Sequence, residues 1–213
     1  MASFLLQENH IALMSNKVGT TTFAKGYSLE EIDKNSLNKL LLNPFKRINL
    51  HHLVRNPLDR VLSVFESKTK KDVENGSWNQ DCQHLLYNHY KGPKDIQAFL
   101  LELNFRDFVL NYLPKVYRED HHYLPQIDYF RERIPWACRS HPTKARSVFG
   151  NHFSLIKLDS EEFAPWATSF GLDPTIILNP SSPVKTVDEE TLWWLEHELY
   201  DEDFEILGYT TNS

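Results

Sequence analysis

The chain of 213 residues has little of what marks secreted, membrane-spanning or nucleic-acid-binding proteins. Its two cysteines, Cys82 and Cys138, lie far apart and make no disulfide framework, which favours a reduced compartment. No apolar run approaches the ~20 residues that a membrane-spanning helix needs, and the first residues lack a basic region followed by an apolar stretch. The net charge of −6 argues against broad electrostatic binding to nucleic acid or anionic lipid. We therefore expect a cytoplasmic protein with no membrane span and no nucleic-acid partner.

The composition is that of a folded globular protein. Hydrophobic residues make up 41% and charged residues 24%, a balance that disordered chains lack. A chain of this length can bury a full core, and we expect one domain over residues 1–213. The negative net charge is still compatible with a local basic pocket for a small anion.

One stretch near the N-terminus has the pattern of an anion-binding turn. The apolar run Ile11 to Met14 predicts a short buried strand, and a loop with Lys17 and Gly19 follows it. Thr20, Thr21 and Thr22 then open a segment that can become helical. A helix start offers unpaired backbone N–H groups, a glycine allows close approach of a ligand, and Lys17 adds a full positive charge. A plain strand-to-helix turn explains this segment alone equally well.

The lysine is in the wrong place for the P-loop of nucleotide triphosphatases. That motif has its lysine after the second glycine and directly before Ser or Thr, whereas Lys17 precedes Gly19. The order Lys17-Val18-Gly19-Thr20-Thr21-Thr22 instead resembles the 5′-phosphosulfate loop of sulfotransferases that use 3′-phosphoadenosine 5′-phosphosulfate (PAPS).

A second motif follows the next predicted strand, Arg47 to Val54. Arg55 ends this strand, Asn56 can cap a helix, and Pro57 suits the first helical position. The helix should bury Leu58, Val61, Leu62 and Phe65 and leave Asp59, Arg60, Ser63 and Ser67 on its polar side. An arginine fork and a serine hydroxyl suit a phosphate, although either residue alone is more simply a surface residue. The run from Arg55 to Phe65 resembles the 3′-phosphate motif of sulfotransferases, with Asn56 in place of the usual Asp.

A histidine pair supplies a candidate general base. His121 and His122 lie in a predicted loop, where an exposed surface role is the simpler interpretation. A histidine titrates near neutral pH and can accept a proton from a hydroxyl. The order His122-Tyr123-Leu124-Pro125-Gln126 resembles a segment of the carbohydrate-type sulfotransferases, which implies that His122 is the base, with His121 as the alternative.

Other elements complete the predicted chain. We expect helices over 81–90, 94–103 and 105–113, a strand over 151–158 and a helix from Ser160 to Gly171. Capping boxes should open helices at Ser28–Glu31 and Thr186–Glu189. Cys82, His84 and His89 match no standard zinc spacing, and 179–185 is most simply a connector. The closing segment 200–209 resembles the same sulfotransferase group and should pack on the core.

Together the motifs resemble PAPS-dependent sulfotransferases over about residues 11–209. The resemblance implies a three-layer, P-loop-NTPase-like α/β fold with a central, mainly parallel sheet flanked by helices. It also implies transfer of a sulfuryl group to an acceptor hydroxyl without a metal. Lys17 would stabilise the leaving group, residues 17–22, Arg55 and Ser63 would bind PAPS, and His122 would act as base. A carbohydrate is the expected acceptor; a lipid, a peptide and a small metabolite stay open, as does the oligomeric state.

Two other functions remain open on the same fold. One is a nucleotide kinase-like phosphotransferase, against which the absence of a Gly-Lys-Thr/Ser sequence argues. The other is a non-catalytic protein that binds a nucleotide or glycan, against which the presence of Lys17, Arg55, Ser63 and His122 argues.

Overall fold

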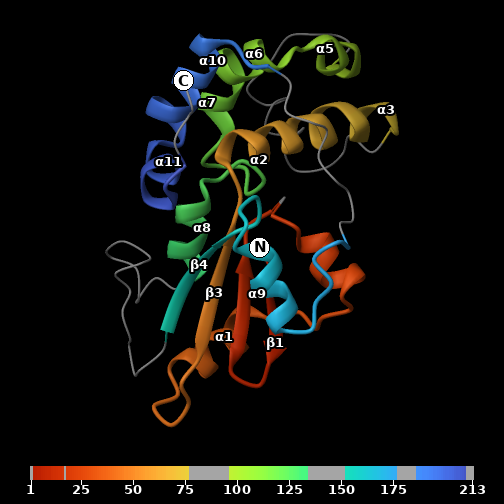
Figure 1. Cartoon of the computed structure of the whole chain (residues 1–213). Coiled ribbons are helices and arrows are strands. Elements are labelled where there is room, and N and C mark those ends of the chain that lie inside the picture. The colour runs from red at the N-terminus through yellow and green to blue at the C-terminus, as the bar shows by residue number, and fades with distance from the viewer. Residues whose placement is uncertain (1, 17, 77–95, 134–151, 177–185, 210–213) are drawn as a thin grey trace. The chain divides into compact units, whose positions relative to one another are not determined.

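A computed structural model describes residues 2–16, 18–76, 96–133, 152–176 and 186–209 (Figure 1). The chain divides into two compact units. The first comprises Met1–Asn56, Gln126–Pro180 and Ile206–Ser213; the second comprises Pro57–Pro125 and Ser181–Glu205. The single domain expected over 1–213 stays a prediction. Among the described residues, no helix combines the length and the apolar character that crossing a membrane requires.

The first unit is built on a four-stranded mixed sheet in the order β1-β2-β3-β4. The strands are β1 (Ala2–Gln7), β2 (His10–Met14), β3 (Asn49–Val54) and β4 (His152–Lys157). β1 is antiparallel to β2, whereas β2–β3 and β3–β4 are parallel pairs. The chain is therefore of the α/β class. β2, β3 and β4 confirm the strands predicted over residues 11–14, 47–54 and 151–158, and β1 is an additional strand.

Helices pack on both faces of this sheet (Figure 1). Successive strand residues point to opposite faces, so Ala12 and Met14 lie on one face while Ile11 and Leu13 lie on the other. The first face is covered by the π-helical turn η1 (Thr22–Gly26) and by α9 (Phe163–Ser169). The second is covered by α1 (Lys34–Leu41) and α8 (Gln126–Arg133). Both faces are apolar because the parallel strands are buried between helices.

The predicted capping box at Ser28–Glu31 is wrong. Ser28 adopts a φ of 53°, and Glu31 forms a bridge with Phe4 of β1. α1 begins later, where Oδ1 of Asp33 accepts the backbone N–H groups of Asn35 and Ser36 at 2.8 and 3.1 Å. The cap at the start of the helix near residue 189 is also shifted, because Asp188 and not Thr186 caps it.

The second unit is helical in its described residues. Its elements are α2 (Pro57–Val64), η2 (Phe65–Lys71), α3 (Asp72–Glu74), α5 (Ile96–Glu102), α6 (Phe105–Asp107), η3 (Phe108–Tyr112), α7 (Leu113–Val116), α10 (Glu189–Trp194) and η5 (Leu195–Leu199). α11 (Asp201–Leu207) begins in this unit and ends in the first. The helix expected over 81–90, with Cys82, His84 and His89, and the connector 179–185 lie outside the described residues.

The end of the described chain packs on the first unit, as predicted. Leu207 joins a buried cluster with Val54 and Ile127. Tyr209 donates its hydroxyl to Oδ1 of Asp159 at 2.7 Å, and Nζ of Lys157 donates to the carbonyl of Gly208 at 2.7 Å.

Candidate functional site

Parallel pairing brings the segments after β2 and β3 to one edge of the sheet. Met14 pairs with Leu53, so the loop that begins at Ser15 and the turn at Arg55 leave the sheet side by side. Ligand sites of α/β proteins lie at this carboxyl edge. Lys17 lies outside the described residues; the rest of its loop does not.

The loop after β2 is anchored in the core at two points. Val18 and Thr22 are buried, whereas Thr20 and Thr21 are partly exposed and open the helical segment. Gly19 has a φ of +75°, a backbone conformation that favours glycine. A Cβ there would lie 3.5 Å from side-chain atoms of Met14 and Leu158, which is ordinary contact. The glycine is therefore required by the turn of the backbone more than by lack of space.

Gln126 holds the backbone of Arg55 in place. Its side chain is fully buried, and its Oε1 accepts the Arg55 N–H at 3.0 Å while its Nε2 donates to the Arg55 carbonyl at 2.8 Å. The next amide, that of Asn56, donates to Oδ2 of Asp159 at 3.0 Å. Both backbone polar groups of Arg55 are thus satisfied by one side chain. The partly exposed Arg55 side chain starts from a fixed point at the carboxyl edge of the sheet.

Neither Gln126 nor Asp159 was a predicted site residue. Gln126 belongs to the histidine motif, where only the histidines were singled out. Ser15 was also missed: it lies directly after β2 and is buried, and its hydroxyl makes no hydrogen bond to any described residue.

Ser63 lies in the last turn of α2. Its side chain is partly exposed, and its hydroxyl makes no hydrogen bond within the described part of the chain. The predicted contact of this hydroxyl with a phosphate stays a prediction.

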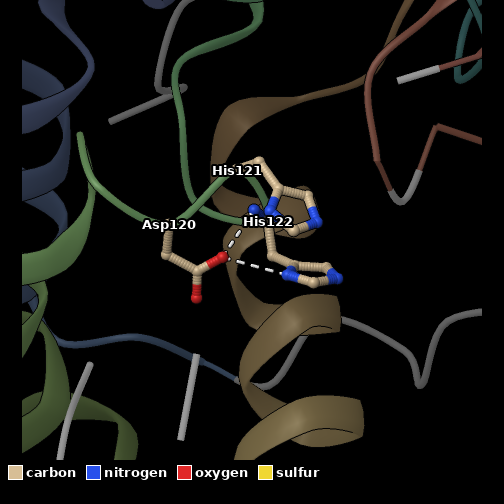
Figure 2. Close-up of side chains that lie close together, drawn as sticks. All are labelled: Asp120, His121 and His122. Carbon is tan, nitrogen blue, oxygen red and sulfur yellow. Dashed lines mark hydrogen bonds and ion pairs between the residues drawn. The ribbon is translucent and has the colours of Figure 1, made fainter. Parts of the chain in front are cut away.

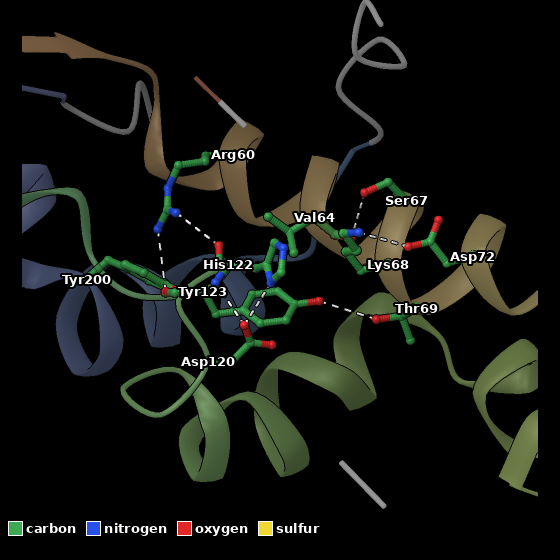
Figure 3. Close-up of polar contacts among 10 residues, drawn as sticks. All are labelled: Arg60, Val64, Ser67, Lys68, Thr69, Asp72, Asp120, His122, Tyr123 and Tyr200. Carbon is green, nitrogen blue, oxygen red and sulfur yellow. Dashed lines mark hydrogen bonds and ion pairs between the residues drawn. The ribbon is translucent and has the colours of Figure 1, made fainter. Parts of the chain in front are cut away.

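The prediction that Arg60 lies on the polar side of this helix is wrong. Arg60 is 0% exposed. Its guanidinium donates to the carbonyl of His122 at 3.1 Å and more weakly to that of Tyr123 at 3.5 Å (Figure 3). It also donates to the carbonyl of Leu124 at 2.8 Å. The arginine therefore holds the histidine loop in shape, because a planar fork of donors can satisfy several carbonyls at once.

Asp120 and His122 form a hydrogen-bonded pair inside this loop (Figure 2). Oδ1 of Asp120 accepts the backbone N–H of His122 at 2.8 Å and lies 2.9 Å from Nδ1 of its ring. The Asp120 side chain is 0% exposed and the His122 side chain 13% exposed. The other ring nitrogen, Nε2, points away from the carboxylate and has no hydrogen-bond partner among the described residues (Figure 2).

Two tyrosines complete the support of the loop (Figure 3). Tyr200 donates its hydroxyl to the carbonyl of Tyr123 at 2.6 Å. Burial raises the pKa of the Tyr200 hydroxyl, so this phenol stays protonated and keeps donating. The hydroxyls of Tyr123 and Thr69 lie 3.3 Å apart within the same buried region. The carbonyls at 122–124 are therefore fixed from two sides, by Arg60 and by Tyr200.

The same loop presents a group that can ligate a cation. Asp120, His121 and His122 each offer one ligand atom, and these atoms lie within 4.8 Å of one another. Carboxylate and imidazole ligands suit zinc and other transition metals. The sequence motifs suggested no metal here, so a metal enters the tests below as an alternative use of the loop.

Comparisons of this chain with protein-family models, with curated proteins and with solved structures give no match. The candidate site is therefore interpreted from its own residues and geometry.

Proposed function

We propose that this protein is a sulfotransferase that moves a sulfuryl group from PAPS to an acceptor hydroxyl, with a carbohydrate as the expected acceptor. The observation that carries the proposal is the shared carboxyl edge of β2 and β3, from which the Val18–Thr22 loop and Arg55 both emerge. In the sequence, these are the two segments that resemble the 5′-phosphosulfate and 3′-phosphate motifs. With this proposal goes the finer fold assignment, a P-loop-NTPase-like arrangement of the parallel strands β2, β3 and β4.

The donor half of the proposal rests on the first unit. A left-handed glycine gives the loop a turn that lets backbone amides approach a phosphate, and Arg55 adds a planar, permanently charged donor. Gln126 fixes the backbone of that arginine, so less of its freedom is lost when a ligand binds. The motif also assigns Ser63 to the 3′-phosphate, for which its hydroxyl is available.

The proton-accepting half rests on the second unit. The Nε2 ring nitrogen of His122 has no hydrogen-bond partner among the described residues. Arg60 and Tyr200 hold the surrounding loop in place through their hydrogen bonds to its carbonyls. A general base has to be held in position, because proton transfer depends on the geometry of donor and acceptor.

In the proposed reaction, bound PAPS supplies the sulfuryl group: a bond forms from the acceptor oxygen to sulfur while the bond from sulfur to the 5′-phosphate oxygen breaks. The proton of the acceptor hydroxyl goes to Nε2 of His122. The predicted role of Lys17 is to stabilise the negative charge that develops on the leaving oxygen, the kind of interaction that accelerates the step most.

Thermal unfolding tests the donor site directly. Wild type, Arg55→Ala and Arg47→Ala are heated with adenosine 3′,5′-bisphosphate, with ATP and magnesium, and without ligand. Arg47 is an exposed arginine that precedes β3, so it controls for loss of charge. A ligand at about 100 times its dissociation constant adds about 2.7 kcal/mol of stability. We expect the bisphosphate to stabilise wild type and Arg47→Ala but not Arg55→Ala.

The other outcomes distinguish the alternatives. Stabilisation by ATP and magnesium but not by the bisphosphate would favour the kinase-like phosphotransferase. No response to either ligand would remove the donor site and leave a non-catalytic binding protein. If the bisphosphate binds, transfer from radiolabelled PAPS to a panel of saccharides then tests the reaction.

A further inference from the structure

The structure assigns to Asp120 a positioning role: it holds His122 in the tautomer with its proton on Nδ1 and its lone pair on Nε2. This inference rests on the proposed function for its catalytic meaning, but the tautomer itself can be measured without any substrate. Asp120 was not among the residues that the sequence motifs singled out.

The hydrogen bonds at Oδ1 define the tautomer. This oxygen lies 2.9 Å from Nδ1 and also accepts the His122 backbone N–H at 2.8 Å. An ionised carboxylate can only accept hydrogen bonds, so a neutral imidazole in this geometry must carry its proton on Nδ1. The second ring nitrogen is then unprotonated, as a base requires.

Burial makes this preference strong. The Asp120 side chain is fully buried, and its Oδ2 has no hydrogen-bond partner among the residues that the structure describes. An isolated buried carboxylate is costly, so the N–H groups that Oδ1 accepts from His122 matter more here than they would in water. The opposite tautomer would present the Nδ1 lone pair to the carboxylate and would leave the carboxylate with the backbone N–H alone.

The loop itself is held independently of this pair. Arg60 donates to the carbonyl of His122, and Tyr200 to that of Tyr123 (Figure 3). Arg60 also donates to the carbonyl of Leu124. These contacts place the backbone around the histidine, so loss of the Asp120 carboxylate should change the ring's tautomer and orientation more than the path of the chain. Asp120→Ala is therefore an informative variant, because it removes the oxygen that lies against Nδ1.

The test is nitrogen NMR of the imidazole rings in the full chain at mildly alkaline pH. Signals of His122 are assigned by their absence in His122→Gln. We expect wild type to show a protonated Nδ1 and an unprotonated Nε2, and Asp120→Ala to shift toward the tautomer protonated on Nε2. Asp128→Ala is the matched control, since Asp128 pairs with Arg131 in α8. It should leave the His122 signals unchanged.

Kinetics add a readout that loss of structure alone would not produce. If PAPS-dependent transfer is found, Asp120→Ala should lower kcat by about 10²-fold, the usual effect of a positioned base, with little change in KM for the donor. A variant that loses donor binding and kcat together would indicate a merely structural role for Asp120.

Wild type alone can overturn the inference, so it stays testable even if Asp120→Ala fails to fold. A wild-type His122 protonated on Nε2 would refute it. So would loss of the His122 Nδ1 proton on adding zinc that is reversed by a chelator, because Nδ1 would then be a metal ligand. Wild type could also show the expected tautomer but neither bind the bisphosphate nor transfer a sulfuryl group. In that case the role of Asp120 in orienting His122 stands, and the proposed reaction is rejected.

Discussion

The side chain of Gln126 forms hydrogen bonds with both backbone polar groups of Arg55: Oε1 accepts the N–H at 3.0 Å, and Nε2 donates to the carbonyl at 2.8 Å. A buried side chain on α8 thus takes the place of a neighbouring strand at the point where β3 ends. The amide makes both bonds because it has one acceptor and one donor group, whereas an ionised carboxylate of the same length has acceptors only.

Replacing Gln126 should therefore change the position of Arg55 although the arginine itself is not substituted. Gln126→Leu leaves an N–H and a carbonyl unpaired, and we expect it to lower the free energy of unfolding by about 1–3 kcal/mol in urea titrations. It should also weaken bisphosphate binding. Gln126→Glu keeps the acceptor and loses the donor, so its effect should be intermediate at a pH where the carboxyl is ionised. Equal bisphosphate affinity in Gln126→Leu and wild type would contradict a positioning role.

Substitutions of Lys17 and of Arg55 should have different effects on kcat and on donor binding. Lys17→Ala is expected to lower kcat by about 10²-fold or more while leaving donor affinity nearly intact, because its predicted contact forms with the developing charge. Arg55→Ala should mainly weaken donor binding, as measured by calorimetry with the bisphosphate. Lys25→Ala, an exposed lysine of η1, is the control for loss of charge. A Lys17→Ala enzyme with near-normal kcat would argue against the assignment.

Gly19 and Gly76 offer a matched pair of glycine substitutions. Their φ angles are +75° and +71°, so alanine at either position should cost about 1 kcal/mol of stability from backbone strain. Only Gly19 lies in the candidate donor loop. We expect Gly19→Ala to reduce the thermal shift caused by the bisphosphate and Gly76→Ala to leave it unchanged. Equal loss in both variants would point to global destabilisation instead of a local effect.

Arg60 should matter for folding far more than a surface arginine. Arg60→Met leaves the buried carbonyls of His122 and Leu124 unpaired, and we expect the free energy of unfolding to fall by about 3 kcal/mol. Arg106 pairs with Asp188 and Glu190 on the surface, where water screens the charges, so Arg106→Met should lower the free energy of unfolding much less than Arg60→Met. Chemical denaturation compares the two variants; similar losses would contradict the buried role of Arg60.

Acid should destabilise the fold through His52. This histidine of β3 stacks on Phe130, and burial lowers its pKa from 6.5 to about 3. Between these values the unfolded chain binds a proton that the folded chain does not, so stability falls as the pH falls below about 6.5. The loss from this residue between about pH 7 and pH 5 should be about 2 kcal/mol.

The pH dependence has its own control. His52→Leu removes this titration and should flatten the fall in stability measured by urea unfolding. Burial and the neighbouring His10 lower the pKa of His51 to about 4, which adds a contribution of the same sign. This second effect should be smaller than that of His52, because His51 is only partly buried and is screened by water. An unchanged pH profile in His52→Leu would refute the first assignment.

Much of the fold and part of the site could be read from local sequence. The apolar run Ile11–Met14 and the apolar residues within Arg47–Val54 marked two core strands, and Pro57 marked the start of α2, because these signals depend on neighbouring residues only. The same strands pointed to the Val18–Thr22 loop and Arg55 as candidates for one anion site.

The helix caps show where local sequence patterns are not sufficient to predict the structure. Ser28–Glu31 has the sequence of a capping box, yet Glu31 forms a bridge with Phe4 and Asp33 caps α1. β1 was missed for a related reason. Antiparallel pairing with β2 holds this strand in place, and its own short apolar run does not reveal which segment it pairs with.

By itself, the sequence determined the candidate residues: a loop with a glycine, an arginine at a strand end, a serine on a helix and a histidine before Pro125-Gln126. Only the tertiary structure decided how these residues are held. Burial made Arg60 a support for three carbonyls, Asp120 a partner for His122 and Gln126 a clamp on Arg55. A polar residue in a sequence is expected to face water, and it takes a role inside the protein only when distant segments supply its hydrogen-bond partners and exclude solvent.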